Sequence, residues 1–233
     1  MADTVSRGHV VHVVVVANGV FRYPQRLRSL LDSADMIIAA DGGANWLYEQ
    51  GLKPNLLVGD MDSVRPEVLA ALERAGCAIR RHPAAKDETD TELALLAAAA
   101  CRPLCVTILG ALGGRIDHEL ANLFLLAMPQ LADIETVLFD GVSFLRLCRR
   151  RCVIEGEVGD TVSLLPLAGD AGGIVTEGLA YPLRGETLYL GPARGVSNVL
   201  TEARAEVRLE TGLLIVIHTP QRYLDAEVRH LEK

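Results

Sequence analysis

Three short polar clusters, far apart along the chain, contain the side chains best suited to chemistry. They occupy residues 59–63, 86–92 and 110–118. Each cluster begins close to the end of an apolar run, and such runs are typical of buried strands. Because ligands of open α/β sheets collect at the carboxyl ends of strands, we expect the three clusters to meet at one edge of a sheet. Together they supply carboxylates, a lysine, an arginine and a glycine loop, a combination that suits a metal-bound polyphosphate.

The first cluster carries two carboxylates, Asp60 and Asp62. In an extended backbone, side chains two residues apart point the same way, with Cα atoms about 6.5–7 Å apart. Mg²⁺ typically takes one or two protein carboxylates and completes its shell with phosphate oxygens and water. The same residues also suit a solvated turn, in which Asp and Ser are common. Spacing alone therefore leaves both interpretations open.

The second cluster combines a helix start with charged groups. Thr89 and Glu92 fit a capping box before an alanine-rich helix. Asp90 falls in the first turn, where it is placed to complete a metal shell, and Lys86 is placed to contact a phosphate. The capping and binding interpretations of Thr89 are compatible.

The third cluster follows an apolar run and precedes a helical pattern. Helix N-termini offer free N–H groups to anions, and glycine lets a phosphate come close. The segment lacks both the Walker A ending and the dinucleotide-binding glycine pattern. Arg115 suits bidentate contact with phosphate oxygens. A plain glycine turn with a surface arginine is the alternative, just as residues 41–43 suit either a tight turn or a substrate contact.

Strand-like and helix-like segments alternate over roughly the first 140 residues, which predicts an α/β domain with a mostly parallel sheet flanked by helices. After Asp140 the pattern changes to short β-prone pieces separated by glycine and proline, which predicts a smaller all-β, sandwich-like domain. We expect domains at 1–140 and 141–220 and a polar tail at 221–233. The strands expected in the second domain cover residues 143–147, 161–165, 173–176, 187–190, 205–209 and 213–218.

The composition restricts the class of partner. Of 233 residues, 50% are hydrophobic, and the formal net charge is -7. An acidic chain argues against a nucleic-acid partner, but a cation can supply positive charge for a phosphate ligand. The apolar run at 10–17 is too short to span a membrane, and no signal peptide is visible. We therefore expect a cytoplasmic protein with no membrane partner.

The five cysteines are expected to stay reduced in that compartment. The pairs Cys101/Cys105 and Cys148/Cys152 have spacings that a zinc site tolerates. Three arginines fill the gap between Cys148 and Cys152 and oppose cation binding. Buried thiols are therefore the favoured interpretation.

Taken together and in order, these motifs resemble the thiamine pyrophosphokinase family. The matching segments are residues 41–44, 59–63, 86–92, 110–118 with Asn122, and 195–198. The resemblance implies a catalytic ATP- and Mg²⁺-binding domain at 1–140 and a thiamine-binding β domain at 141–220. It also implies a homodimer with thiamine bound near the subunit interface.

The resemblance also implies roles for single residues. It makes Asp60, Asp62 and Asp90 the Mg²⁺ carboxylates and places the other catalytic and binding residues around them. Near the nucleotide phosphates it places Arg115, Gly110, Gly113 and Gly114, with Lys86 and Thr89 beside them. In the same cleft it places Asp41, Asp117 and Asn122. At the thiamine it places Ser197, with its neighbour Asn198. Tyr181 stands where the family often has a tryptophan that stacks on the substrate ring.

The implied reaction transfers the diphosphoryl group of ATP to the hydroxyl of thiamine, giving thiamine diphosphate and AMP. The substrate alcohol is the nucleophile, so catalysis rests on positioning and charge neutralisation. Asp90 and Asp117 are both candidates to accept the hydroxyl proton. Because of Tyr181, another hydroxymethyl heterocycle such as a pterin remains an alternative substrate. A non-catalytic nucleotide or thiamine sensor is a further alternative, although a sensor is expected to lose the acidic cluster, which is present here.

Overall fold

The computed structural model describes residues 11–224, and the chain divides between Thr136 and Val137 into two compact units. Sequence composition indicates a boundary a few residues later, near Asp140. The valine-rich run His9 to Ala17 predicts a strand. Residues 9 and 10 of this run, and residues 225–233 of the expected tail, lie outside the described residues.

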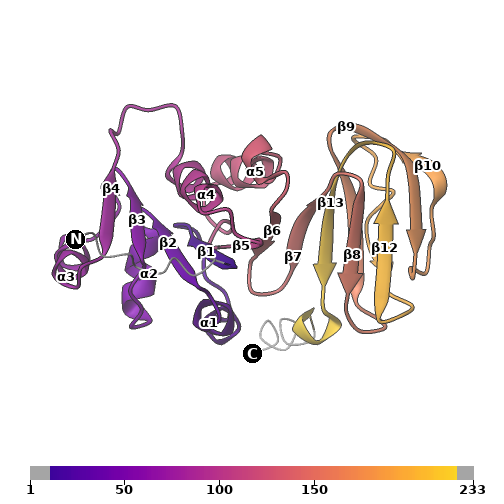
Figure 1. Cartoon of the computed structure of the whole chain (residues 1–233). Helices are drawn as coiled ribbons and strands as arrows, with labels where there is room; N and C mark the ends of the chain where they lie inside the picture. Colours follow the sequence, from indigo (N-terminus) through magenta and orange to yellow (C-terminus); the bar gives the residue numbers. More distant parts are fainter. Residues whose placement is uncertain (1–10, 225–233) are drawn as a thin grey trace, which may run out of the picture. The chain divides into compact units, whose positions relative to one another are not determined.

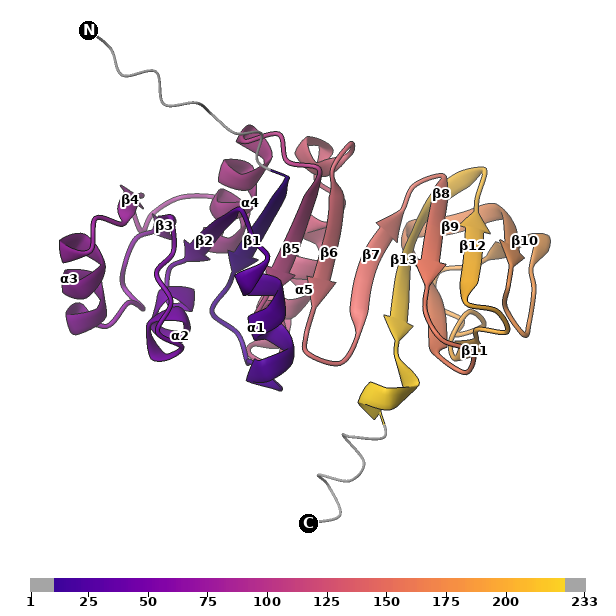
Figure 2. The ribbon, with the colours of Figure 1, turned by 60° about the horizontal axis from the view of Figure 1, so that its bottom comes forward.

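The first unit is built on a parallel sheet. Its strands run in the order β4-β3-β2-β1-β5 (Figure 2). Every neighbouring pair in this order is parallel. The side chains of Val13 to Val16 in β1 are fully buried, as expected for a central strand covered on both faces. The bounds are β1 His12–Val16, β2 Met36–Ala40, β3 Leu56–Gly59, β4 Ala78–Arg81 and β5 Cys105–Leu109.

Helices cover both faces of this sheet. Figure 1 shows α4 and α5 on one face and α1 and α2 on the other. The bounds are α1 Pro24–Asp32, α2 Gly43–Glu49, α3 Pro66–Arg74, α4 Asp90–Ala100 and α5 Ile116–Leu125, with a 3₁₀ turn at Pro129–Leu131. The helical pattern of the sequence suggests that α5 continues to Met128, but it ends earlier. Met128 precedes Pro129 and adopts an extended ψ of 133°, as residues before proline prefer.

The strand order creates a crevice at the carboxyl end of β1. From β1 the chain builds β2, β3 and β4 outward on one side, and then returns to place β5 on the other side of β1. The connections that leave β1 and β5 therefore diverge. In open α/β sheets this switch point is where ligands bind.

The second unit is a sandwich-like, mostly β structure, and with the first unit it confirms the predicted fold class. The first half of β9 pairs with β13 and β11, and its second half pairs with β10 and β12. An apolar cluster that includes Ile154, Leu164 and Val207 forms the core. The bounds are β6 Glu135–Phe139, β7 Phe144–Cys148, β8 Arg151–Glu155, β9 Thr161–Glu177, β10 Arg184–Leu188, β11 Asn198–Val199, β12 Arg204–Arg208 and β13 Thr211–Thr219.

The long strand β9 corrects one prediction. The strands expected at 161–165 and 173–176 are parts of this single strand, which passes from one set of partners to the other. Ala168, Gly169 and Gly173 have φ values of 63°, 119° and 65°, so the backbone can bend without ending the strand. Strands β8 and β11 are absent from the sequence-based expectation.

The structure also bears on membrane-spanning helices and on the cysteines. Across residues 11–224, none of the helices has the length and apolar character needed to cross a membrane. All five cysteines are free. Cys148 and Cys152 are buried, as the buried-thiol interpretation expects, whereas Cys77, Cys101 and Cys105 are half-buried. Hydrogen bonding to Cys152 and burial raise the pKa of the Cys148 thiol, so this thiol resists becoming a thiolate ligand.

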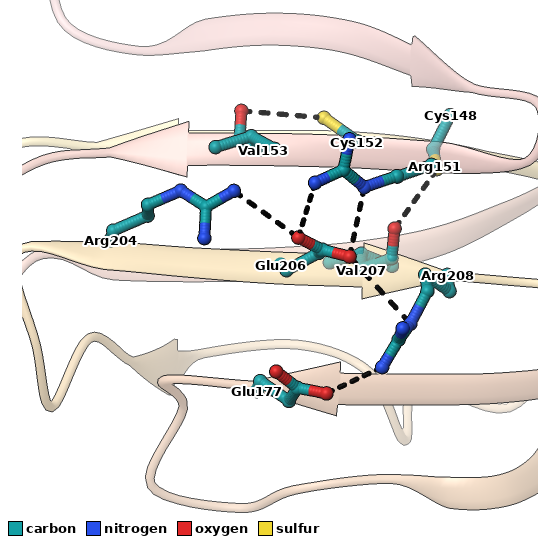
Figure 3. A network of polar contacts seen from close by, with 9 residues as sticks. All are labelled: Cys148, Arg151, Cys152, Val153, Glu177, Arg204, Glu206, Val207 and Arg208. Atoms are coloured by element: carbon teal, nitrogen blue, oxygen red, sulfur yellow. Dashed lines mark hydrogen bonds and ion pairs between the residues drawn. The ribbon is translucent and has the colours of Figure 1, made fainter.

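A network of ion pairs crosses β8, β12 and β9 around Glu206 (Figure 3). Arg151 contacts both carboxylate oxygens of Glu206, at 2.9 and 2.7 Å. Arg204 and Arg208 lie 3.3 and 3.7 Å from the same carboxylate, and Arg208 also pairs with Glu177. The hydrogen bonds from Arg151, followed by the charges of the three arginines, lower the pKa of Glu206 to about 2.

We expect Glu206→Gln to lower Tm at pH 7, because three arginines lose their shared counter-charge. A carboxyl with a lowered folded-state pKa stabilises the fold fully above its ordinary pKa of 4.5, and this contribution is lost as the pH falls through about 2. The Tm difference between wild type and variant should therefore shrink as the pH is lowered from 7 to about 3. Glu177→Gln is the control, because it removes an ion pair of Arg208 but keeps Glu206 as the counter-charge of all three arginines. A Tm difference that does not change with pH would contradict this account.

Candidate active site

A cleft of about 590 Å³ opens in the first unit at the switch point beside β1 and β5. Its walls come from the segments that follow each of β1, β2, β3, β4 and β5 and from the first turns of α4 and α5. The charged and polar lining residues include Asn18, Asp41, Asp60, Asp62, Ser63, Lys86, Glu88, Thr89, Asp90, Arg115, His118, Glu119 and Asn122.

Three carboxylates gather in this cleft, with one oxygen from each of Asp41, Asp60 and Asp62 within 4.8 Å of the others. Asp60 and Asp62 lie on the turn that follows β3, which we call the acidic turn, whereas Asp41 follows β2. Hydrogen bonds fix the acidic turn and join it to Asp41. Asp60 Oδ1 accepts from the Asp62 N–H at 3.0 Å, and the Ser63 N–H donates to Asp41 Oδ2 at 3.2 Å. Met61, between the two acids, has a φ of 71°, a strained value for a residue with a side chain. Such strain is often found at functional sites.

Asp41 is the most buried of the three, with 4% of the residue exposed, and its Oδ1 has no hydrogen-bond partner. Burial raises the pKa of Asp41, and the nearby charges of Asp90 and Asp62 raise it further. An unpartnered oxygen among converging negative charges is unfavourable unless a cation compensates it. This donor set of hard oxygens therefore fits a divalent cation such as Mg²⁺.

Lys86 lies between two of the acids. Its Nζ is 3.0 Å from Asp90 Oδ1 and 3.6 Å from Asp60 Oδ2. Burial opposes the charge on Lys86, but the hydrogen bonds and charges of Asp90 and Asp60 outweigh this and raise its pKa. Asp90 is thus paired with a lysine. The three acids whose oxygens lie closest together are Asp41, Asp60 and Asp62, so Asp41 stands where the sequence motif suggests Asp90.

The glycine segment and the N-terminus of α5 form the anion-binding side of the cleft. Gly110 and Gly113 have φ values of 65° and 85°. The N-cap residue Arg115 makes no capping bond to α5, and the His118 N–H donates to Asp117 Oδ1 at 3.0 Å, so the N–H groups of residues 116 and 117 are the ones offered to a ligand. Arg115 lines the cleft, and its Nη2 lies 2.6 Å from Asp117 Oδ2. The cleft is also lined by Gly110 and Gly114, but Gly113 and Asp117 are not among its lining residues.

Two polar residues serve both the fold and the cleft. The Thr89 hydroxyl accepts a hydrogen bond from the Glu92 N–H at 3.1 Å and so caps α4. Asn122 is buried and donates from Nδ2 to the Ala111 carbonyl at 2.8 Å, which ties α5 to the glycine segment. Both residues also line the cleft, so the two interpretations of Thr89 are compatible in the structure.

The sequence analysis missed Asn18, which lines the cleft directly after β1. Its side chain contacts the backbone of the β2–α2 turn, because a Cβ on Gly42 would lie 2.4 Å from Asn18 Cγ. In the sequence, Asn18 and Gly19 look only like the end of a strand. Their importance depends on β5 lying beside β1, and local sequence does not reveal strand order.

The predicted thiamine residues lie together in the second unit. Asn198 binds the Tyr181 backbone in both directions: its Oδ1 accepts from the Tyr181 N–H at 3.0 Å, and its Nδ2 donates to the Tyr181 carbonyl at 2.8 Å. Tyr181 is 72% exposed. Ser197 has a φ of 59°, and its N–H donates to Ser163 Oγ at 3.0 Å. The tyrosine ring is therefore presented to solvent on an ordered backbone.

A doubly wound sheet with converging carboxylates, a largely covered lysine and a helix N-terminus without a side-chain cap at its switch point is typical of enzymes that act on phosphate compounds. Comparison with known proteins gives the family. The model of the thiamin pyrophosphokinase catalytic domain matches residues 27–138, and that of the thiamin pyrophosphokinase vitamin B1 binding domain matches residues 151–214. The chain belongs to the thiamine pyrophosphokinase family.

Individual relatives agree with this result. The chain is 29% identical to thiamine pyrophosphokinase from Bacillus subtilis, over 88% of this chain and 97% of the relative. It is 29% identical to thiamine pyrophosphokinase 2 of rice, over 83% of this chain and 82% of that protein. The crystal structure of the Bacillus subtilis enzyme superposes with a TM-score of 0.79 at 28% identity, covering 90% of this chain and 99% of that one.

The space at Gly59 leads to a prediction. A Cβ on Gly59 would lie 2.9 Å from Asp41 Cβ and 3.1 Å from Asp90 Oδ1. We expect Gly59→Ala to push these carboxylates apart and to weaken binding of Mg²⁺ or Mn²⁺, measured by calorimetry, at least tenfold. Gly76→Ala is the matched control, because Gly76 also has positive φ but nothing lies within 4 Å of its Cβ position. Equal cation affinity in the two variants would show that the carboxylates do not form a common site.

Proposed function

We propose that the protein transfers the β,γ-diphosphoryl group of ATP to the hydroxyl of thiamine, yielding thiamine diphosphate and AMP. The observation that carries the proposal is the single cleft lined by Asp41, Asp60 and Asp62, by Lys86, and by the glycine segment before α5. Membership of the thiamine pyrophosphokinase family supports the same reaction.

In this proposal, Mg²⁺ is held by carboxylates of the acidic turn. The sequence motif suggests Asp60, Asp62 and Asp90 as its ligands. The geometry favours adding Asp41, which offers an oxygen within 4.8 Å of those of Asp60 and Asp62, and it favours Asp90 as a partner of Lys86. When bound, the cation supplies positive charge that orients and polarises phosphate oxygens.

The residues around the acidic turn neutralise the phosphate chain. The free N–H groups at the start of α5 and the glycine segment bind phosphate oxygens. Arg115 releases Asp117 and turns its guanidinium to the nucleotide, an exchange favoured by the exposure of both side chains, 74% and 59%. Lys86 is already fixed beside Asp60 and Asp90 and offsets charge as AMP leaves.

The thiamine hydroxyl attacks the β-phosphorus, and a carboxylate accepts its proton. Asp90 is favoured over Asp117 for this role. Asp90 lines the cleft, whereas Asp117 is not among its lining residues and is bound to Arg115. The hydrogen bond from Arg115 lowers the pKa of Asp117, which disfavours proton transfer to that carboxylate.

The second unit binds thiamine in this proposal. The exposed ring of Tyr181 stacks on the substrate, and Ser197 contacts it, with Asn198 fixing the Tyr181 backbone. As in the family pattern, we propose that the protein works as a homodimer in the cytoplasm, with thiamine near the subunit interface.

We expect Asp60→Asn to lower turnover at least 100-fold, because the acidic turn loses one of its charges while its hydrogen bonds can persist. The assay mixes protein, thiamine, ATP and Mg²⁺ and measures AMP. Asp32→Asn is the control, since Asp32 is an exposed acid paired with Arg28 and is not among the residues that line the cleft. Folded wild-type protein that produces no AMP would reject the proposed reaction.

We expect Tyr181→Ala to raise the KM for thiamine about tenfold, since a stacked ring typically contributes about 0.5–1.5 kcal/mol beyond its buried area. The KM for ATP should change by less than twofold. Tyr189→Ala is the matched control, because Tyr189 is 60% exposed in the same unit. Turnover of a hydroxymethylpterin that exceeds turnover of thiamine would favour the alternative substrate instead.

A further inference from the structure

The segment that follows β1 is bound along the glycine segment that follows β5. Three backbone hydrogen bonds continue the contact between these strands beyond their ends and into the cleft. They run from Ala17 N to Leu109 O (2.8 Å), from Gly19 N to Gly110 O (2.6 Å) and from Val20 N to Leu112 O (2.8 Å). The conformation of the glycine segment therefore depends on residues 17–21, which we call the β1 extension.

Side chains of the β1 extension occupy the space that the glycines leave. A Cβ on Gly110 would lie 2.4 Å from Phe21 Cζ, and a Cβ on Gly113 would lie 2.6 Å from Val20 Cβ. Gly110 is thus required both for its φ of 65° and for the approach of the Phe21 ring.

The Phe21 ring is itself fixed from the other side. It stacks on Trp46, with ring centroids 4.1 Å apart and an angle of 7° between the planes. Trp46 belongs to α2, the helix that follows the Asp41 turn. A continuous line of contacts therefore runs from α2 through Trp46 and Phe21 to Gly110.

We infer that Phe21, stacked on Trp46, is a positioning residue for the nucleotide. The inference rests on the proposed function, in which the glycine segment and the start of α5 bind the phosphates of ATP. The stack keeps the glycine segment in one conformation before ATP arrives, so that binding does not have to order it. Its loss acts on ATP and leaves the thiamine contacts of the second unit unchanged.

The stack can be removed from either ring. Phe21→Ala and Trp46→Ala each delete one partner, whereas Trp46→Phe keeps a stacked ring. We expect both alanine variants to raise the KM for ATP about tenfold, with the KM for thiamine changed by less than twofold. Trp46→Phe should stay within about twofold of wild type, because an aromatic pair is retained.

The control removes an equivalent stack elsewhere. Phe139 and Phe144 have centroids 4.2 Å apart and an angle of 12° between their planes, and neither is among the residues that line the cleft. Phe144→Ala should lower Tm without changing the KM for ATP. This variant separates general destabilisation from an effect on the nucleotide.

Binding is also measured without turnover. Calorimetry with MgATP alone gives the affinity of each variant, and circular dichroism confirms folding. Because Trp46 is the only tryptophan in the chain, its fluorescence also reports nucleotide binding in wild type and Phe21→Ala. A wild-type protein that binds ATP but forms no AMP would reject the proposed reaction, while the variants still decide the role of Phe21.

Wild-type ATP affinity in folded Phe21→Ala and Trp46→Ala would overturn the inference. If Phe21→Ala does not fold, the comparison of Trp46→Ala with Trp46→Phe decides: a selective loss of ATP affinity in the first supports the inference, and equal affinities overturn it. An equal rise in the KM for ATP and for thiamine would also overturn it.

Discussion

The acidic turn and Asp41 bring like charges together, and this is the constraint on which the cleft depends. Asp41, Asp60 and Asp62 converge, and Asp90 adds to the charge that Asp41 experiences. Carboxylates this close repel one another unless positive charge lies between or beside them. In the protein alone, Lys86 supplies part of that charge, and Gly59 allows the close approach because it has no Cβ. The remaining unpartnered oxygen of Asp41 is available to a cation.

Strand order converts this local turn into a site. The acidic turn follows β3, whereas the glycine segment follows β5. They reach one cleft because β2 and β3 lie on one side of β1 in the sheet and β5 lies on the other. Negative charge for a cation and free N–H groups for an anion thus occur in the same space, as a metal-bound polyphosphate requires.

The sequence predicts the features that are local. The apolar runs indicate the strands, Thr89 and Glu92 indicate the start of α4, and the change in pattern near Asp140 indicates a different kind of domain. Features that depend on distant contacts were not predictable in this way. Asn18 enters the cleft only because β5 lies beside β1, and β9 is one strand only because its two halves find different partners. The closeness of Asp41 to Asp60 depends on the adjacency of β2 and β3, which spacing does not reveal.

Lys86 and Arg115, two positively charged side chains of the cleft, differ in how firmly the surrounding residues hold them. The Lys86 side chain is 11% exposed and contacts two acids, so its position is fixed by the fold. Arg115 is 74% exposed, and its ion pair joins it to Asp117, two residues away. Solvent screens exposed pairs of this kind and makes them weak, so replacing Asp117 by a phosphate as the partner of Arg115 costs little. The cleft thus combines two kinds of positive charge. Lys86 is held in place and balances the acids, whereas Arg115 can move with the phosphates as their charge distribution changes during transfer.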